Sequence, residues 1–183
     1  MMRELADNVL DIAQNSVAAG ASLLKLTITV DEAADLITLI FSDNGCGMTP
    51  EFAQKVTDPF TTTRKTRKVG LGLPFLKMTA QTTGGDFSLE SQVGVGTTVK
   101  ASFGLKNIDR PPMGDLAGTL QTLVILNTHM DFLITYRGPK DEFVFDTRQI
   151  KPMVEPLELN HPDIAAWISD YIKEGMNECG TVE

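Results

Sequence analysis

The chain has 183 residues, 42% of them hydrophobic and 22% charged, and a formal net charge of −8. This composition indicates a soluble globular protein with room for one domain and a sizeable extension, and the charge argues against broad binding to nucleic acid or to an acidic membrane. Cys46 and Cys179 fit free thiols in a reducing compartment. The sequence shows neither the apolar core of a signal peptide nor a membrane-length apolar run, so we expect a cytoplasmic protein.

Residues 4–19 predict a helix, because apolar residues recur on two adjacent stripes. A third stripe is polar throughout and consists of Glu4, Asn8, Asp11 and Asn15. This stripe is either the solvent face or, for Asp11 and Asn15 one turn apart, part of a site.

An apolar strand in the next segment ends at an acidic residue and two glycines. The alternation of apolar and polar residues over residues 24–30 predicts a half-buried strand. Residues 36–42 predict a second strand that returns antiparallel. Asp43, Gly45 and Gly47 follow. A carboxylate there can accept a hydrogen bond from a ligand's amino group, and the glycines would let a flat ring or a phosphate approach the backbone. The same residues also suit an ordinary turn.

A short helix, an irregular loop and a second glycine pair come next. Thr49 and Pro50 suit the cap and first position of a helix. Residues 58–69 have neither helical nor strand period, and we expect a mobile loop rich in threonine and basic residues. Gly70-Leu71-Gly72-Leu73 opens another helix, which the glycines at 84 and 85 end.

Two further strands complete a compact α/β unit. Apolar and polar residues alternate over residues 87–90 and 99–103, which predicts two strands. The turn at 94–98 joins them as a hairpin. We expect a first domain over residues 1–105.

Residues 106–183 form the expected extension of unknown role. Asp115 can cap an apolar helix, residues 132–136 and 143–145 predict a hairpin, and His161 precedes a last amphipathic helix that frays from about Asn177.

In this order the parts resemble the GHKL ATP-binding superfamily, which includes type II topoisomerases, heat-shock chaperones of the ninety-kilodalton class, histidine kinases and mismatch-repair ATPases. The matching parts are the helix with Asp11 and Asn15, Asp43-x-Gly45-x-Gly47, the basic loop, Gly70-x-Gly72 and Gly94-x-Gly96-Thr97. The resemblance implies the Bergerat ATP-binding fold. This is an α/β (α+β) two-layer sandwich with a mixed, mostly antiparallel sheet covered by helices on one face, here followed by a C-terminal α+β extension.

The resemblance also implies how ATP is bound. Asp43 resembles the residue that accepts a hydrogen bond from the adenine amino group, and Gly45 and Gly47 let the loop pass beside the base. Thr97, or Thr98, resembles the threonine that assists Asp43 through water.

The phosphates and their cation would be bound at a second group of residues. Asn15 resembles the Mg²⁺ ligand, since an amide oxygen suits a hard ion. The backbone of Gly70-Leu71-Gly72-Leu73 and the helix it opens would meet the phosphates.

The basic loop resembles the lid of sensor kinases. Phe60 resembles their phenylalanine box, or it is a core residue that anchors the lid. One of Arg64, Lys65 and Lys68 is expected to face the phosphates, with Lys65 as the named candidate. The alternative for this cluster is a solvated surface patch.

Asp11 is the catalytic candidate, although the family usually has glutamate four residues before the asparagine. Aspartate is one methylene shorter, which affects its reach to an attacking water. Glu4 and Asn8 have the same spacing, but the sequence after Asn15 resembles the mismatch-repair version more closely. Ala18 stands where topoisomerase-like members have an acidic residue.

The resemblance to histidine-kinase catalytic domains predicts phosphoryl transfer from ATP·Mg²⁺ to a partner protein. His129 and His161 have poor context for phosphorylation, so we expect the acceptor on another protein. The alternatives are an ATP hydrolase of the mismatch-repair or topoisomerase type and a non-catalytic, ATP-dependent protein-binding module. No nucleic-acid or membrane partner is expected. The sequence leaves open whether the chain forms a homodimer.

Overall fold

The computed structural model describes residues 3–58 and 71–181. The helices in these residues are α1 (Leu5–Ala18), α2 (Pro50–Val56), α3 (Gly72–Thr82), α4 (Leu116–Leu126), α5 (Thr147–Val154) and α6 (Pro162–Cys179). The strands are β1 (Leu23–Asp31), β2 (Leu36–Asp43), β3 (Phe87–Gln92), β4 (Gly96–Gly104), β5 (Asp131–Arg137) and β6 (Glu142–Asp146). None of the described helices combines the length and the apolar character that crossing a membrane requires.

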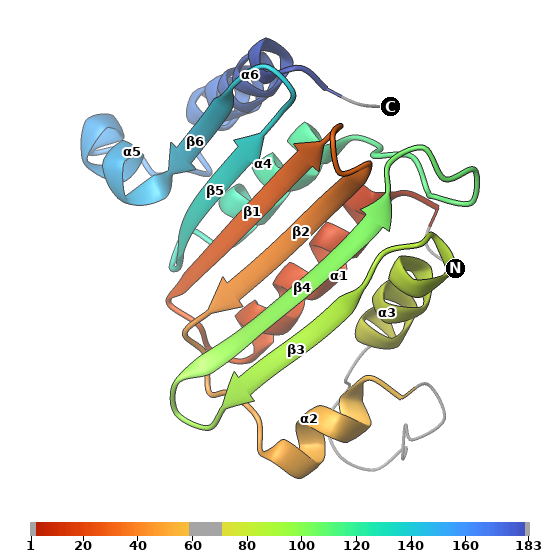
Figure 1. The fold of residues 1–183 in the computed structure, drawn as a ribbon. Coiled ribbons are helices and arrows are strands. Elements are labelled where there is room, and N and C mark those ends of the chain that lie inside the picture. The colour runs from red at the N-terminus through yellow and green to blue at the C-terminus, as the bar shows by residue number, and fades with distance from the viewer. Residues whose placement is uncertain (1–2, 59–70, 182–183) are drawn as a thin grey trace.

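The strands form one sheet in the order β3-β4-β2-β1-β5-β6, in which β1 and β5 are parallel and the other neighbours are antiparallel (Figure 1). In Figure 1 the helices α1 and α4 lie behind the sheet. This confirms the expected two-layer arrangement with a mixed, mostly antiparallel sheet.

The alternation of buried and more exposed side chains along β1 shows which face of the sheet is covered by helices. Leu26 on β1 is buried opposite Phe41 on β2 and Ile134 on β5, so one row of side chains crosses three strands. The intervening residues, such as Lys25, face the other way and are more exposed. Because strand side chains alternate between faces, the apolar residues of all three strands meet under the helices.

The chain beyond residue 105 contributes to the same sheet and core. β5 pairs with β1, α4 packs against α1, and α6 packs against α4 and β6. The backbone N–H groups of Leu5 and Ala6 donate to the carbonyl oxygens of Pro112 and Met113 at 2.9 and 3.0 Å. The start of α1 is therefore held by the connector that precedes α4, since its first N–H groups have no partners within the helix.

Several predicted helix ends are confirmed, and two features differ from expectation. Thr49 accepts from the N–H of Phe52 at 3.3 Å, and Asp115 accepts from that of Gly118 at 2.9 Å. The helix α5 was not predicted, because it is short and contains Pro152. The last helix continues to Cys179 instead of fraying near residue 177, since its inner residues are buried in the core.

The end of α6 is tied to β5. The hydroxyl of Tyr136 donates to the carbonyl oxygen of Gly180 at 3.0 Å. Burial raises the pKa of Tyr136 to about 12, so the phenol keeps its proton and remains a donor.

Candidate functional site

A cavity of about 510 Å³ opens beside the second half of α1. Its walls come from α1, the ends of β2 and β4, the loop that follows β2, and the helices α2 and α3. Asn15, Asp43 and Thr97, which belong to three different sequence motifs, all line it.

Asp43 is the last residue of β2 and is held from two sides. Its Oδ2 accepts a hydrogen bond from the Ser16 hydroxyl at 2.7 Å, and its Oδ1 accepts from the Gly45 N–H at 2.9 Å. A carboxylate has about four acceptor positions, so these two bonds orient the group and leave positions for a ligand donor.

The glycine loop after Asp43 is fastened to the turn between β3 and β4. Gly47 has φ +67°, and a Cβ on it would lie 1.9 Å from the carbonyl oxygen of Gln92. The N–H of Gly94 donates to the carbonyl oxygen of Cys46 at 2.8 Å. Only glycine fits at position 47, because a side chain there would both strain the backbone and collide with the neighbouring strand.

Of the two threonines left open by the sequence, Thr97 lies in the cavity wall. It is the register partner of Asp43, and its hydroxyl lies 2.8 Å from that of Ser91. The hydroxyl of Thr98 instead lies 3.0 Å from that of Ser42. Consecutive strand residues point to opposite faces, so only one of the two can reach the cavity.

Asn15 and Asp11, one turn apart on α1, have different surroundings. Asn15 lines the cavity, whereas Asp11 is not among the described residues that do so. The Asp11 carboxylate lies against the first residue of α3, where a Cβ on Gly72 would be 1.9 Å from its Oδ2. Burial raises the pKa of Asp11. Asn15 thus lines the cavity directly, while Asp11 contacts the start of α3, the helix from which Leu73 lines the same cavity.

The alternative pair, Glu4 and Asn8, lies at the other end of α1. Asn8 is 1% exposed, and its Nδ2 donates to the Glu4 carbonyl oxygen at 3.1 Å. The Glu4 carboxylate packs against Gly114, since a Cβ there would lie 2.0 Å from its Oε2. Neither residue is among the described residues that line the cavity beside Asp43.

The remaining predicted site residues divide into two groups. Leu73 on α3 lines the cavity, while Leu71 just before α3 is exposed. Phe60, Lys65 and Gly70 lie outside the described residues, as do the alternative cations at positions 64 and 68.

Two serines at the site were not identified from the sequence. Ser16 ends an apolar stripe of α1, and a hydroxyl in that position is a signal that could have been used. Ser91 accepts from the Met48 N–H at 2.8 Å and contacts Thr97. Its place opposite Thr97 follows from the register of the β3–β4 hairpin, which the turn between these strands sets.

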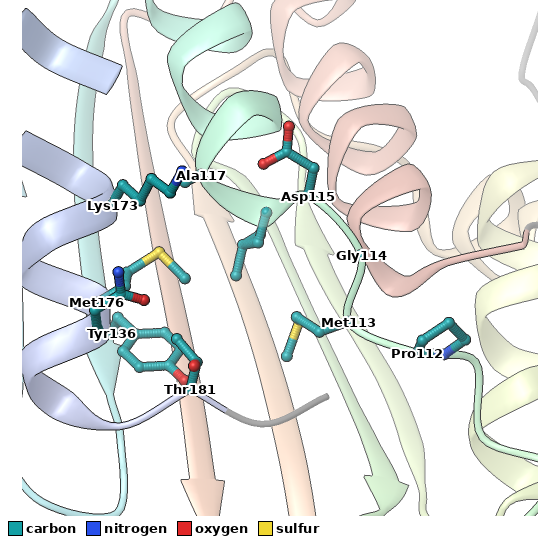
Figure 2. Close-up of a pocket in the computed structure, with 11 residues that line it drawn as sticks. Pro112, Met113, Gly114, Asp115, Ala117, Tyr136, Lys173, Met176 and Thr181 are labelled. Atoms are coloured by element: carbon teal, nitrogen blue, oxygen red, sulfur yellow. The ribbon is translucent and has the colours of Figure 1, made fainter. Parts of the chain in front are cut away.

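A second cavity, of about 370 Å³, lies between the start of α4, the end of α6 and β5 (Figure 2). Met113, Tyr136, Lys173 and Met176 are among its lining residues. It contains none of the described residues from the glycine motifs and is separate from the site beside Asp43.

Comparison with known proteins identifies the class to which this fold and site belong. Residues 1–107 match the family described as histidine kinase-, DNA gyrase B-, and HSP90-like ATPase, and the chain belongs to this family. This confirms the resemblance seen in the sequence.

Individual relatives agree with this assignment. The chain is 30% identical over 102 residues to a putative sensor histidine kinase NtrY-like of Rickettsia conorii, covering 56% of this chain and 17% of that protein. It is 33% identical over 102 residues to the sensor protein SrrB of Staphylococcus aureus, covering 53% of this chain and 17% of that protein. The match therefore spans about a sixth of these curated relatives.

A solved structure extends the likeness in fold to most of the chain. The Aquifex aeolicus MutL ATPase domain, complexed with ADP, superposes with a TM-score of 0.54 and 15% identity, covering 95% of this chain and 70% of that one.

Proposed function

We propose that this protein binds ATP with Mg²⁺ in the cavity beside Asp43 and transfers the γ-phosphoryl group to a partner protein. The observation that carries the proposal is the Asp43 carboxylate, oriented by Ser16 and Gly45 and facing a cavity of about 510 Å³. Because the chain belongs to an ATPase family, we interpret this cavity as the nucleotide-binding site.

The site suits adenine in particular. The free acceptor positions of Asp43 can take a hydrogen bond from the exocyclic amino group of adenine. Guanine carries a carbonyl at that position, which would face the carboxylate as a second acceptor. Phe41 and Val99, buried beneath the cavity, and the half-buried Met48 offer apolar surface to the faces of the ring.

The residues present also suit Mg²⁺ held mainly by the nucleotide. Among the described residues no group of three or more histidine, cysteine, aspartate or glutamate side chains could hold a metal ion. Mg²⁺ usually retains several waters and takes few protein ligands beside phosphate oxygens. The amide oxygen of Asn15 would supply one such ligand from the cavity wall.

The phosphate end of the site would be at the start of α3. The free N–H groups of a helix N-terminus favour anions, and Leu73 brings this terminus to the cavity. Asp11 packs against Gly72 there. For an acceptor hydroxyl or water, Asp11 is the candidate general base, whereas a histidine acceptor requires no strong base.

Two other activities are supported by particular observations. The structural likeness to the MutL ATPase domain favours ATP hydrolysis. A binding module whose partner surface changes with nucleotide remains an alternative on the sequence alone, which has a basic, threonine-rich segment between α2 and α3. Phosphoryl transfer is preferred because the curated relatives quoted above are sensor kinases or sensor proteins.

The test uses γ-labelled ATP and candidate acceptor proteins encoded by neighbouring genes. Label on an added protein supports transfer, free phosphate alone supports hydrolysis, and tight binding with neither supports the binding module. Asp43→Asn should abolish all three signals, whereas Glu32→Gln, on the exposed β1–β2 turn, should change none. Unchanged ATP affinity in Asp43→Asn would overturn the assignment of the site.

A further inference from the structure

One face of α6 combines acidic and aromatic side chains. In a helix with 3.6 residues per turn, six exposed residues fall on this face: Asp163, Trp167, Asp170, Tyr171, Glu174 and Glu178. We call this set the acidic–aromatic stripe. The opposite face of α6 carries Ile168, Ile172 and Met176, which are buried in the core.

The stripe itself holds no cation. Lys173 is the only basic residue of α6, and Figure 2 shows it extending toward α4 on the side of the second cavity. Within the described residues Asp170, Glu174 and Glu178 form no salt bridge, so their charges remain available.

The aromatic residues of the stripe are fixed in place and yet face solvent. Trp167 and Tyr171 are 42% and 39% exposed, and their rings stack with centroids 5.1 Å apart. Tyr171 also meets Phe143 of β6 edge-on, at 5.4 Å. Phe143 lies directly on Gly175, where a Cβ would be 2.1 Å from its ring. The rings therefore form a preorganised platform, which reduces the entropy lost when a ligand stacks on it.

The platform lies next to an open edge of the sheet. In the part of the chain that the structure describes, β6 pairs with β5 alone and ends the strand order. Figure 1 shows α6 running beside this edge strand. A partner that approaches the stripe would therefore lie close to an edge strand that pairs with no further strand among the described residues.

We propose that the acidic–aromatic stripe of α6 is a docking surface for an arginine-bearing segment of a partner protein. A guanidinium group can stack on the Trp167–Tyr171 platform while it bonds to a carboxylate of a neighbouring turn, such as Asp170 or Glu174. The surface thus matches arginine both in charge and in its planar shape. This inference does not depend on nucleotide binding.

Other occupants fit the surface less well. Nucleic acid would be repelled by the carboxylates and by the net charge of −8. A second copy of the chain, paired symmetrically through this face, would bring like charges together.

The experiment exploits the fact that Trp167 is the only tryptophan in the chain. Its fluorescence reports directly from the stripe during titration with octa-arginine, octa-lysine or octa-glutamate. We expect a saturable change with octa-arginine, binding about three- to tenfold weaker with octa-lysine, and no change with octa-glutamate.

Matched variants distinguish the contribution of the stripe's own charges from that of the protein's net charge. Glu174→Gln with Glu178→Gln should weaken octa-arginine binding about fivefold or more, because two carboxylates beside the Trp167–Tyr171 platform no longer form charge-assisted bonds to arginine. Glu32→Gln with Glu90→Gln removes the same charge from exposed sites elsewhere and should change binding less than about twofold. Tyr171→Leu should remove the preference for arginine over lysine.

Three results would overturn the proposal. The first is no change in Trp167 emission with octa-arginine. The second is an equal loss of binding in the two double variants, which would mean that only net charge matters. The third is sedimentation of the chain as a dimer that Tyr171→Leu dissociates, which would make the platform a self-association surface. Far-UV circular dichroism of each variant verifies that it is folded.

Discussion

The helix α1 carries the same pattern twice, an acidic residue followed four positions later by asparagine, and the two ends of the helix use it differently. At the first pair, Asn8 is buried and bonds to the backbone of Glu4, whose carboxylate packs against Gly114. At the second pair, Asn15 lines the cavity beside Asp43, and Asp11 lies against α3. Spacing selects the face of a helix, whereas the elements packed around each turn decide what a side chain can do there.

The neighbours of the two ends explain the difference. The first turn is covered by the connector at residues 112–114, which accepts its free N–H groups. The last turns face the cavity, where Ser16 reaches Asp43. We therefore expect substitutions to distinguish a structural end of α1 from a ligand-facing end.

The largest expected effect separates the two asparagines. Asn15→Ala should weaken Mg²⁺-dependent ATP binding about thirtyfold, or about 2 kcal/mol, because an amide oxygen leaves the proposed metal site. Asn8→Ala should leave the affinity unchanged. Isothermal titration of both variants with ATP, with and without Mg²⁺, measures the difference, and equal losses would place both residues outside the binding site.

Removal of the Ser16 hydroxyl should have the next largest effect. Ser16→Ala deletes the 2.7 Å bond to the Asp43 carboxylate, and hydrogen bonds to charged groups contribute about 1.5 kcal/mol or more. We expect a loss of about 1.5 kcal/mol in the free energy of unfolding and several-fold weaker ATP binding. Urea denaturation and titration measure both, and Ser16→Thr, which keeps a hydroxyl, should recover part of the affinity.

At the structural end, a stabilising substitution is available. The Oδ1 of Asn8 is buried without a hydrogen-bond partner among the described residues. Replacing such a group by an apolar one of similar size removes its desolvation cost, so Asn8→Leu should raise the free energy of unfolding by about 1 kcal/mol. Lower stability in urea denaturation would show that the bond from Nδ2 to the Glu4 carbonyl oxygen outweighs the desolvation cost of Oδ1. ATP affinity should not change.

The smallest effect concerns Asp11 and depends on pH. Burial raises the pKa of Asp11 in the folded protein, so the folded state holds this proton more tightly than the unfolded chain does. Ionisation of Asp11 therefore costs stability, and the cost appears as the pH rises above the ordinary value of 3.8. Asp11→Asn should be slightly more stable than wild type at pH 7, and this advantage should vanish below about pH 3.8. Thermal denaturation of both proteins across this range tests the sign.

Much of the architecture could be predicted from local pattern. The alternation of β1 and the capping residues Thr49 and Asp115 act within a few neighbouring residues, so they are readable without tertiary contacts. The parallel pairing of β1 with β5 was not predicted, because those strands are far apart in the sequence and no turn links them. The short α5 was missed because its boundaries depend on packing rather than on a long apolar period.

The same division holds for the candidate site. Asp43, Gly47 and Thr97 were found because carboxylates and glycines at strand ends form ordered motifs along the chain. Ser16 was not found, since it comes from α1 and meets Asp43 only through packing, whereas Ser91 pairs with Thr97 across the β3–β4 hairpin and was overlooked. The contact of Asp11 with the start of α3 likewise depends on helix packing.

The sequence by itself determined the described strands, the described helices except the short α5, the order of the glycine motifs and the family to which the chain belongs, because each depends on residues close together in the chain. Only the tertiary structure decided which of two threonines faces the cavity, that Ser16 reaches Asp43, and that the chain beyond residue 105 extends the same sheet. These outcomes depend on strand register and helix packing, which bring together residues distant in sequence and cannot be inferred from any short segment.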